Sequence, residues 1–289
     1  MPDGAYLELI SFTHPESHYP PSSPTHDARC RQPWANKACG WVAYAFLGAP
    51  RATQPLSALL NERLAYAGST TRYASENAGG RTRPDGVEIR WEITPPMRWA
   101  EKEGGTRLPF FCGDVTPRDL RVRGKLPYLS PPSVSPFLFA RCGCGMRYDI
   151  PVLTHLPARL RLTSRQVPTR PSSNTKHPNG ALSIAHLRVL APPNVFVGVA
   201  TELTAIVGEP PIEDSEGKLV WLLDLPGKVT PRWHPQLILC EPDVDDEDEL
   251  HFAQTHGAGL FEIGVRVYET HGKRGCSDTP FGRVAWIPV

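Results

Sequence analysis

The 289-residue sequence contains no run of 18 consecutive apolar residues, so we expect no transmembrane helix. It does not begin with a charged segment followed by an apolar one, which argues against a secretory signal peptide. Neither sign of charge is in excess, because 31 Lys and Arg stand against 30 Asp and Glu, for a formal net charge of +1. Such a balance creates no general attraction to nucleic acid or to an anionic membrane. We therefore expect a cytoplasmic protein with no nucleic-acid partner and no membrane partner.

A disulfide framework is also absent. The seven cysteines are scattered and odd in number, which in a chain of this size favours a reducing compartment. The two cysteines of RCGCG, residues 141–145, have no second Cys or His pair at zinc-finger spacing. The sequence holds neither a phosphate-binding glycine loop nor a GxSxG nucleophile elbow. It does hold 32 prolines, which indicate many loops.

Three segments are typical of irregular structure. Residues 13–37 are rich in Pro, Ser and His without a period, and predict a long surface loop. Residues 123–167 have a single acid, frequent prolines and no useful periodicity, so we expect a disordered or inserted segment. A functional long loop is the alternative there. Residues 241–249 carry seven acids but fail the calcium-loop pattern, because the sixth position from Asp243 is Asp248 rather than glycine. A solvated acidic loop is expected instead.

The order of secondary structure is the same in two parts of the chain. In residues 39–115 we predict, in order, a strand at 39–48, a helix at 55–68, a short strand within 70–86, and strands at 87–94 and 108–115. In residues 181–267 we predict a strand at 181–192, a helix at 194–208, and strands at 218–226, 235–242 and 259–267. Asn194 is a candidate N-cap of the second helix and Gly208 its C-terminal stop.

This repeated strand–helix–strand–strand–strand order predicts an internal structural repeat without sequence identity. The helix of a βαβββ unit covers one sheet face, and a neighbouring unit must close the other. We therefore predict an α+β fold in which paired βαβββ modules form curved mixed sheets around a cleft. The expected domains are residues 1–121 (a partial first module and a complete second one), a disordered or inserted linker at 122–176, and a C-terminal module and tail at 177–289.

Three short stretches carry a family resemblance: YLELI (residues 6–10), RPDGVEIRW (83–91) and PFFCGD (109–114). Together they resemble the glyoxalase-like domain family of the vicinal oxygen chelate superfamily, over roughly residues 3–121. The likeness extends more loosely, at superfamily level, to residues 168–267. It implies that YLELI is the last strand of a first module whose earlier elements are missing. A truncated gene model and a degenerate paralogue would both explain that loss.

The resemblance implies metal ligands on the first and last strands of a module, facing its concave side. In the C-terminal module these strands carry His186 and Glu262, and imidazole and carboxylate donors suit divalent Zn, Fe, Ni or Mn. Strand alternation puts Glu262 on the opposite face from Phe261 and Ile263, and so toward the cleft. Glu8 holds the analogous last-strand place in the first module, as a third ligand or a general base. The alternative is a hydrogen-bonded histidine and two paired carboxylates.

Arg90 lies on the charged face of the strand at 87–94, between Glu88 and Glu92. An arginine there could clamp a substrate carboxylate through two hydrogen bonds, and the alternative is an ion-paired sheet face. His14 and His18 have a spacing that suits a metal only on a helix, which the neighbouring prolines oppose. We expect them to be loop histidines.

These features predict a glyoxalase-like protein with a small-molecule ligand. For an enzyme, the implied chemistry is metal-dependent lyase, isomerase or dioxygenase work on a small oxygenated molecule. The alternatives are a non-catalytic binding member that has lost the metal site and a truncated, inactive product. An unpaired module leaves an open sheet edge, which favours a homodimer.

Overall fold

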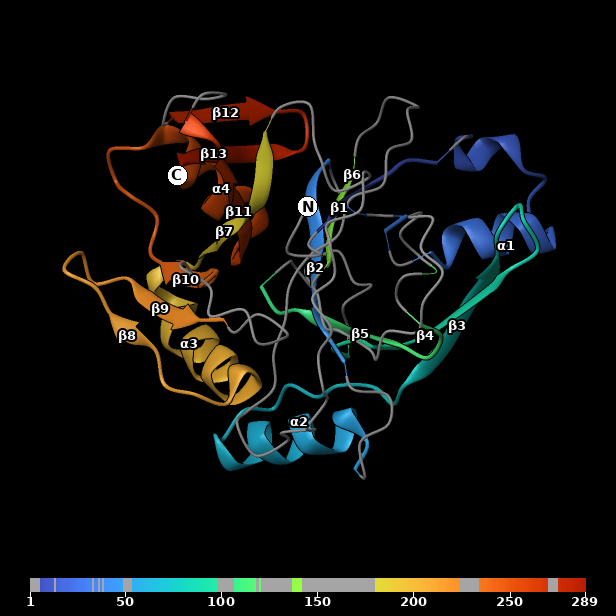
Figure 1. Ribbon diagram of the computed structural model, residues 1–289, viewed down its shortest axis with the longest axis horizontal. Helices are drawn as coiled ribbons and strands as arrows, with labels where there is room; N and C mark the ends of the chain where they lie inside the picture. Colours follow the sequence, from blue (N-terminus) through green and yellow to red (C-terminus); the bar gives the residue numbers. More distant parts are fainter. Residues whose placement is uncertain are drawn as a thin grey trace.

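The computed structural model describes residues 6–48 apart from 13, 33, 36 and 38, and residues 54–97, 107–117, 120, 137–141, 180–223, 234–269 and 275–289. Two mixed β-sheets and a few helices make up these residues, which confirms the predicted α+β class (Figure 1). In the described part of the chain, no helix is long and apolar enough to cross a membrane.

The N-terminal sheet contains the first predicted βαβββ unit. Its elements are β2 (Gly40–Leu47), α2 (Leu56–Tyr66), β3 (Asn77–Thr82), β4 (Glu88–Thr94) and β5 (Phe110–Asp114). The sheet order is β1-β6-β2-β5-β4-β3, with β1 (Tyr6–Ile10) at one edge and β6 (Phe137–Arg141) beside it. Glu76 caps α2, because its carboxylate accepts hydrogen bonds from the Ser57 backbone N–H at 2.8 Å and the Ser57 hydroxyl at 3.0 Å.

The C-terminal sheet has the order β12-β13-β11-β7-β10-β9-β8. Its βαβββ unit comprises β7 (Ala181–Leu190), α3 (Pro193–Val207), β8 (Ile212–Glu213), β9 (Leu219–Leu222) and β10 (Gln236–Cys240). After the unit come α4 (Glu247–His256), β11 (Gly259–Val267), β12 (Gly275–Thr279) and β13 (Gly282–Pro288). The helix α3 ends at Gly208, as predicted, with a left-handed φ of 86° that suits glycine, but its N-cap is Pro192 rather than Asn194.

The two sheets share one pairing pattern over six strands. In each unit the first strand is parallel to the last, and the remaining neighbours are antiparallel. On the other side of the first strand lies an antiparallel strand, which is β6 or β11, followed by a parallel one, which is β1 or β13. The repeat predicted from the order of elements is therefore observed, and it extends two strands beyond the βαβββ unit.

Two strand assignments differ from the prediction. The predicted strand at 259–267 is β11, and it pairs with β7 on the side away from β10, so it lies outside the unit. The short strand β8 takes the missing place, and its two residues are too few to produce a visible alternation. By the same pattern the counterpart of β11 is β6, and β1 is the counterpart of β13. Glu8, in β1, therefore does not occupy the place analogous to that of Glu262.

Four other segments also contain elements that the sequence did not predict. Residues 13–37 contain η1 (Glu16–His18) and α1 (Pro24–Cys30), and the Ser23 hydroxyl caps α1 by accepting from the His26 N–H at 3.1 Å. The expected acidic loop runs into α4, whose N-cap Asp246 accepts from two backbone N–H groups. The tail forms β12 and β13. Within 123–167, residues 137–141 form β6 between β1 and β2, and the rest of that segment lies outside the described residues.

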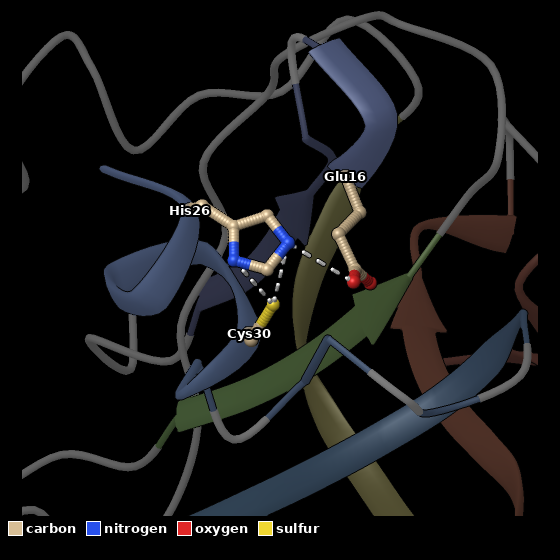
Figure 2. A group of neighbouring side chains, drawn as sticks. All are labelled: Glu16, His26 and Cys30. Atoms are coloured by element: carbon tan, nitrogen blue, oxygen red, sulfur yellow. Dashed lines mark hydrogen bonds and ion pairs between the residues drawn. The ribbon is translucent and has the colours of Figure 1, made fainter. Parts of the chain in front are cut away.

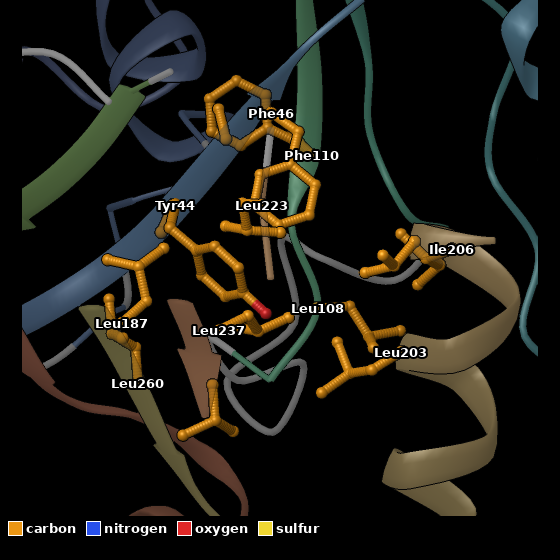
Figure 3. Close-up of a cluster of buried hydrophobic side chains, with 14 of the residues drawn as sticks. Tyr44, Phe46, Leu108, Phe110, Leu187, Leu203, Ile206, Leu223, Leu237 and Leu260 are labelled. Atoms are coloured by element: carbon orange, nitrogen blue, oxygen red, sulfur yellow. The ribbon is translucent and has the colours of Figure 1, made fainter. Parts of the chain in front are cut away.

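One hydrophobic core joins the two halves. It includes Tyr44, Phe46 and Phe110 from the N-terminal sheet together with Leu187, Leu203, Leu237 and Leu260 from the C-terminal half (Figure 3). The helices α2 and α3 contact each other, as do β2 and β11. The buried Tyr44 hydroxyl donates to the Arg107 carbonyl at 2.9 Å, so the core leaves this polar group satisfied. The halves are thus held together by side chains that fill the space between them.

Candidate functional site

The predicted ligands His186 and Glu262 lie next to each other. His186 is in β7 and Glu262 in β11, on adjacent antiparallel strands, and the His186 Nε2 atom is 2.8 Å from the Glu262 Oε1 atom. Gly264 pairs directly with His186, and a β-carbon at Gly264 would lie 2.4 Å from the His186 ring. The imidazole therefore occupies the space that a larger residue would fill. The side chains are 15% and 9% exposed, so the pair is largely shielded from solvent.

The Glu262 carboxylate is held in its ionised form. Burial raises the pKa of Glu262, but the hydrogen bond with His186 and the nearby charges of His186, Arg188 and Arg283 outweigh it, so the pKa lies below its ordinary value. The Cys276 Sγ atom lies 3.7 Å from the second oxygen, Oε2. Burial and the Glu262 charge raise the pKa of the Cys276 thiol, which keeps it protonated. Glu262 thus joins a histidine on one side to a thiol on the other.

A β-bulge changes the expected faces of β11. The register shifts between Leu260 and Glu262, so Phe261 is an extra residue in the strand. Its side chain therefore lies on the same face of the sheet as Glu262, although strict alternation would place it on the opposite face. Phe261 packs with Leu190 and Cys240 in a small second cluster rather than in the main core. The prediction that Phe261 lies opposite Glu262 is therefore wrong, whereas Ile263 does lie in the main core.

Two arginines surround the Phe261 ring and attach α4 to the sheet. Their guanidinium carbons lie 5.6 Å (Arg188) and 4.8 Å (Arg283) from the ring centre. Arg188 donates at 2.5 Å to Glu249, which is only 3% exposed. Arg283 is within 2.9 Å of both Asp246 and Asp248. Acidic residues expected in a solvated loop are therefore the anchors of a helix. Burial lowers the pKa of Arg283, but its hydrogen bonds to Asp246 and Asp278 outweigh that effect and raise it.

A hollow of about 1060 Å³ lies beside this network, between the two halves. Its walls come from Lys37 and residues 39–42 of the N-terminal half, the start of α3, the C-terminal part of α4, and the β12–β13 turn. Phe261, Arg283 and Asp278 line it, but His186 and Glu262 do not. The pair is adjacent to the lining residues: Glu262 follows Phe261 in the chain and is paired in register with Arg283.

The other two predicted site residues lie elsewhere. Glu8 is in β1, at the edge of the N-terminal sheet, paired in register with Phe139 of β6. Arg90 is in β4, where its Nε atom donates to Glu88 at 3.0 Å and both side chains are exposed. The structure thus brings together two of the four predicted residues and places Arg90 in a surface ion pair.

Sequence reasoning missed one constellation of potential ligands. Glu16, His26 and Cys30 offer three donor atoms within 4.8 Å of one another, which no other trio in the described ranges does. The signal that could have revealed them is the Ser23-Pro24 pair, since a Ser cap followed by Pro is typical of a helix start. A helix from Pro24 puts His26 and Cys30 one turn apart.

Comparisons with known proteins identify the N-terminal part of the chain. Residues 1–127 match the family model of the glyoxalase-like domain. The match lies where the motifs of the sequence pointed, and it confirms the resemblance drawn from them. No curated protein matches the chain.

Three solved structures show partial likeness, and each alignment includes 80% of this chain. A hypothetical protein from Staphylococcus aureus has 7% identity, a TM-score of 0.42 and 61% of its own length covered. A xylose isomerase-like TIM barrel/4-hydroxyphenylpyruvate dioxygenase fusion protein has 10% identity, a TM-score of 0.25 and 37% covered. A triple mutant of 4-hydroxymandelate synthase from Streptomyces coelicolor has 11% identity, a TM-score of 0.23 and 72% covered. The chain spans less than two thirds of the length of the first two.

Proposed function

We propose that this glyoxalase-like protein binds a small oxygenated molecule in the hollow between its halves, and that His186 and Glu262 are the chemical centre beside it. The observation that carries the proposal is the 2.8 Å contact between the His186 imidazole and an ionised, shielded carboxylate. Such a pair can hold a divalent metal or move a proton at the imidazole. Lyase, isomerase or dioxygenase chemistry is the reaction class that we infer.

The donors fit a divalent metal in kind. Imidazole nitrogen and carboxylate oxygen suit Zn, Fe, Ni or Mn, and a metal bound there would polarise an oxygen atom of the ligand. Glu262 would supply a charged oxygen and His186 a ring nitrogen, and Gly264 leaves room for the ring. Arg188 and Arg283 keep Glu262 ionised. We place Glu8 and Arg90 outside this centre, since they lie in the other sheet.

A second candidate function is small-molecule binding without a metal. It is favoured by the number of donors, because His186 and Glu262 do not belong to a three-donor group in the part of the chain that the structure describes. The described residues therefore supply no third donor within reach of both side chains. In this alternative the His186–Glu262 hydrogen bond is a permanent part of the wall behind the hollow.

Metal analysis of the purified full-length protein separates the two functions. We expect the wild type to hold a metal fraction that His186→Ala and Glu262→Gln both remove and that Cys39→Ser leaves in place, since Cys39 is an exposed thiol in the other half. If neither substitution changes the metal content, the metal-dependent reading is wrong and metal-free binding is retained. Cytoplasmic location and a homodimer remain predictions alongside this proposal.

A further inference from the structure

A second group of donor atoms lies on the N-terminal helices, far along the chain from His186. Glu16 comes from η1, and His26 and Cys30 come from α1 (Figure 2). His26 and Cys30 are four residues apart on a helix, so their side chains share one face. The Ser23 hydroxyl and Pro24 fix the start of that helix, and η1 brings Glu16 over the same face. All three side chains point toward a common centre in Figure 2.

The spacing of the donors matches the edges of a metal tetrahedron. The Glu16 Oε1 and His26 Nε2 atoms are 3.5 Å apart, and the Cys30 Sγ atom is 3.8 Å from both His26 ring nitrogens. A tetrahedral zinc with bonds of about 2.0 Å to N or O and about 2.3 Å to S has N–O and N–S edges of roughly 3.3 and 3.6 Å. These two distances are therefore within a few tenths of an ångström of bonding positions, and the third, from Glu16 to Cys30, is at most 4.8 Å.

A fourth side chain, Asp27, lies beside the imidazole. The Asp27 Oδ1 atom lies 3.6 Å from His26 Nδ1, on the ring edge away from Glu16. A carboxylate at this place favours the tautomer with its proton on Nδ1, which leaves the Nε2 lone pair directed at Glu16 and free for a metal. Carboxylate–histidine–metal arrangements of this kind are usual around bound zinc.

We propose that Glu16, His26 and Cys30 form a binding site for a divalent cation of the zinc type. Thiolate, imidazole and carboxylate are the donors that zinc takes, and thiolate disfavours magnesium and calcium. Glu16 is exposed and the other two are half-buried, so the fourth coordination position faces water. The metal closes the segment between η1 and α1, and the Cys30 thiol releases its proton when it binds. This site is independent of the proposed function at His186.

Cobalt titration of the full-length protein tests the site. Co²⁺ replaces zinc and absorbs light through charge transfer from a bound thiolate, so the signal reports on cysteine ligation itself. We expect the wild type to develop this absorption with one equivalent of Co²⁺ at the site and to lose it when Zn²⁺ is added. Cys30→Ser should abolish the absorption, and Glu16→Gln, which keeps the shape of the side chain, should weaken the affinity at least about tenfold. Asp27→Asn should weaken it about tenfold as a change in an orienting partner.

Three controls make the result specific. Cys39→Ser and Cys276→Ser remove exposed thiols outside the site and should keep the absorption. His186→Ala should keep it too, which separates this site from the proposed function. Circular dichroism of each variant checks that it folds. The proposal is overturned if the wild type gives no thiolate–cobalt absorption, if that absorption survives in Cys30→Ser, or if Glu16→Gln binds Co²⁺ as tightly as the wild type.

Discussion

At the scale of the residue, a missing β-carbon decides where the His186 imidazole lies. Gly264 and His186 face each other across β11 and β7, and the ring fills the space above the glycine backbone. The ring could not reach Glu262 in the same way over a larger residue. The register of β7 and β11 and the absence of a side chain at Gly264 together determine where the His186 ring lies.

Substitution of Gly264 tests this arrangement. Gly264→Ala places a methyl group 2.4 Å from the ring, so we expect destabilisation of about 1–3 kcal/mol by overpacking. The matched control is Gly198→Ala in α3, where a β-carbon meets no atom within 4 Å. That change should stabilise the protein by about 0.5–1 kcal/mol through helix propensity. Urea unfolding at neutral pH measures both, and equal effects would contradict the prediction.

The shifted pKa of Glu262 predicts a dependence of stability on pH. Because the folded-state pKa lies below the unfolded value of about 4.3, its stabilisation is complete above that value and is lost as pH falls through the folded pKa. Glu262→Gln lacks this contribution, and we expect it to be less stable than the wild type by about 1–3 kcal/mol at pH 7. The difference should shrink below about pH 4. A difference that stays constant with pH would show that ionisation plays no part.

At the scale of the element, α4 is held by charge rather than by an apolar stripe. Glu249 is its one buried residue in the described structure, and it joins Arg188 to the backbone N–H of Asp243. A buried ion pair contributes little in net terms, but the loss of one partner leaves the other charge unpaired. The helix therefore depends on these polar contacts and on Phe252, whose ring packs edge-on against Phe261 at 5.3 Å.

The anchoring of α4 is tested by comparing a buried with an exposed pair. Glu249→Ala leaves Arg188 without its buried carboxylate, and we expect a cost of about 3–5 kcal/mol. Glu216→Ala removes the surface partner of Lys218 and should cost less than about 1 kcal/mol. Chemical denaturation gives both values. Similar costs for the two variants would mean that Glu249 does not anchor the helix.

The elements show which sequence signals were sufficient. Alternation in 87–94 and helical spacing in 55–68 predicted β4 and α2, because both bury one regular face. The helices α1 and α4 were missed since one has no buried residue and the other buries an acid. In both, capping by Ser23 or Asp246 was the available signal. The choice of His186 and Glu262 came from the family resemblance, although β11 lies outside the predicted unit, and neither their register nor the bulge at Phe261 has a signal in the sequence.

At the scale of the whole molecule, the two halves depend on each other. The Trp41 indole N–H donates to the Arg283 carbonyl at 3.3 Å, and its ring lies over Gly282, where a β-carbon would be 2.5 Å away. Glu202 of α3 accepts from the Ser69 hydroxyl at 3.0 Å. The shared core also means that the apolar face of each half is covered by side chains of the other half.

We therefore expect the full-length protein to unfold in one cooperative transition. Tryptophan fluorescence and far-ultraviolet circular dichroism should give the same midpoint in urea. A fragment of residues 180–289 should not fold, because its inner face would be exposed to water. A cooperative thermal transition of that fragment would instead support the separate C-terminal domain that the sequence predicts at 177–289.

The six-strand pattern common to both sheets has a consequence for chain connectivity. The strand β1 comes before its unit in the chain, while its counterpart β13 comes after. One sheet is thus a circularly permuted version of the other. The strand beside β6 or β11 precedes the unit in the N-terminal sheet, as β1, and follows it in the C-terminal sheet, as β13. Assembly evidently tolerates either route, so a recombinant gene that encodes residues 6–12 downstream of residue 141 should yield the same β content by circular dichroism.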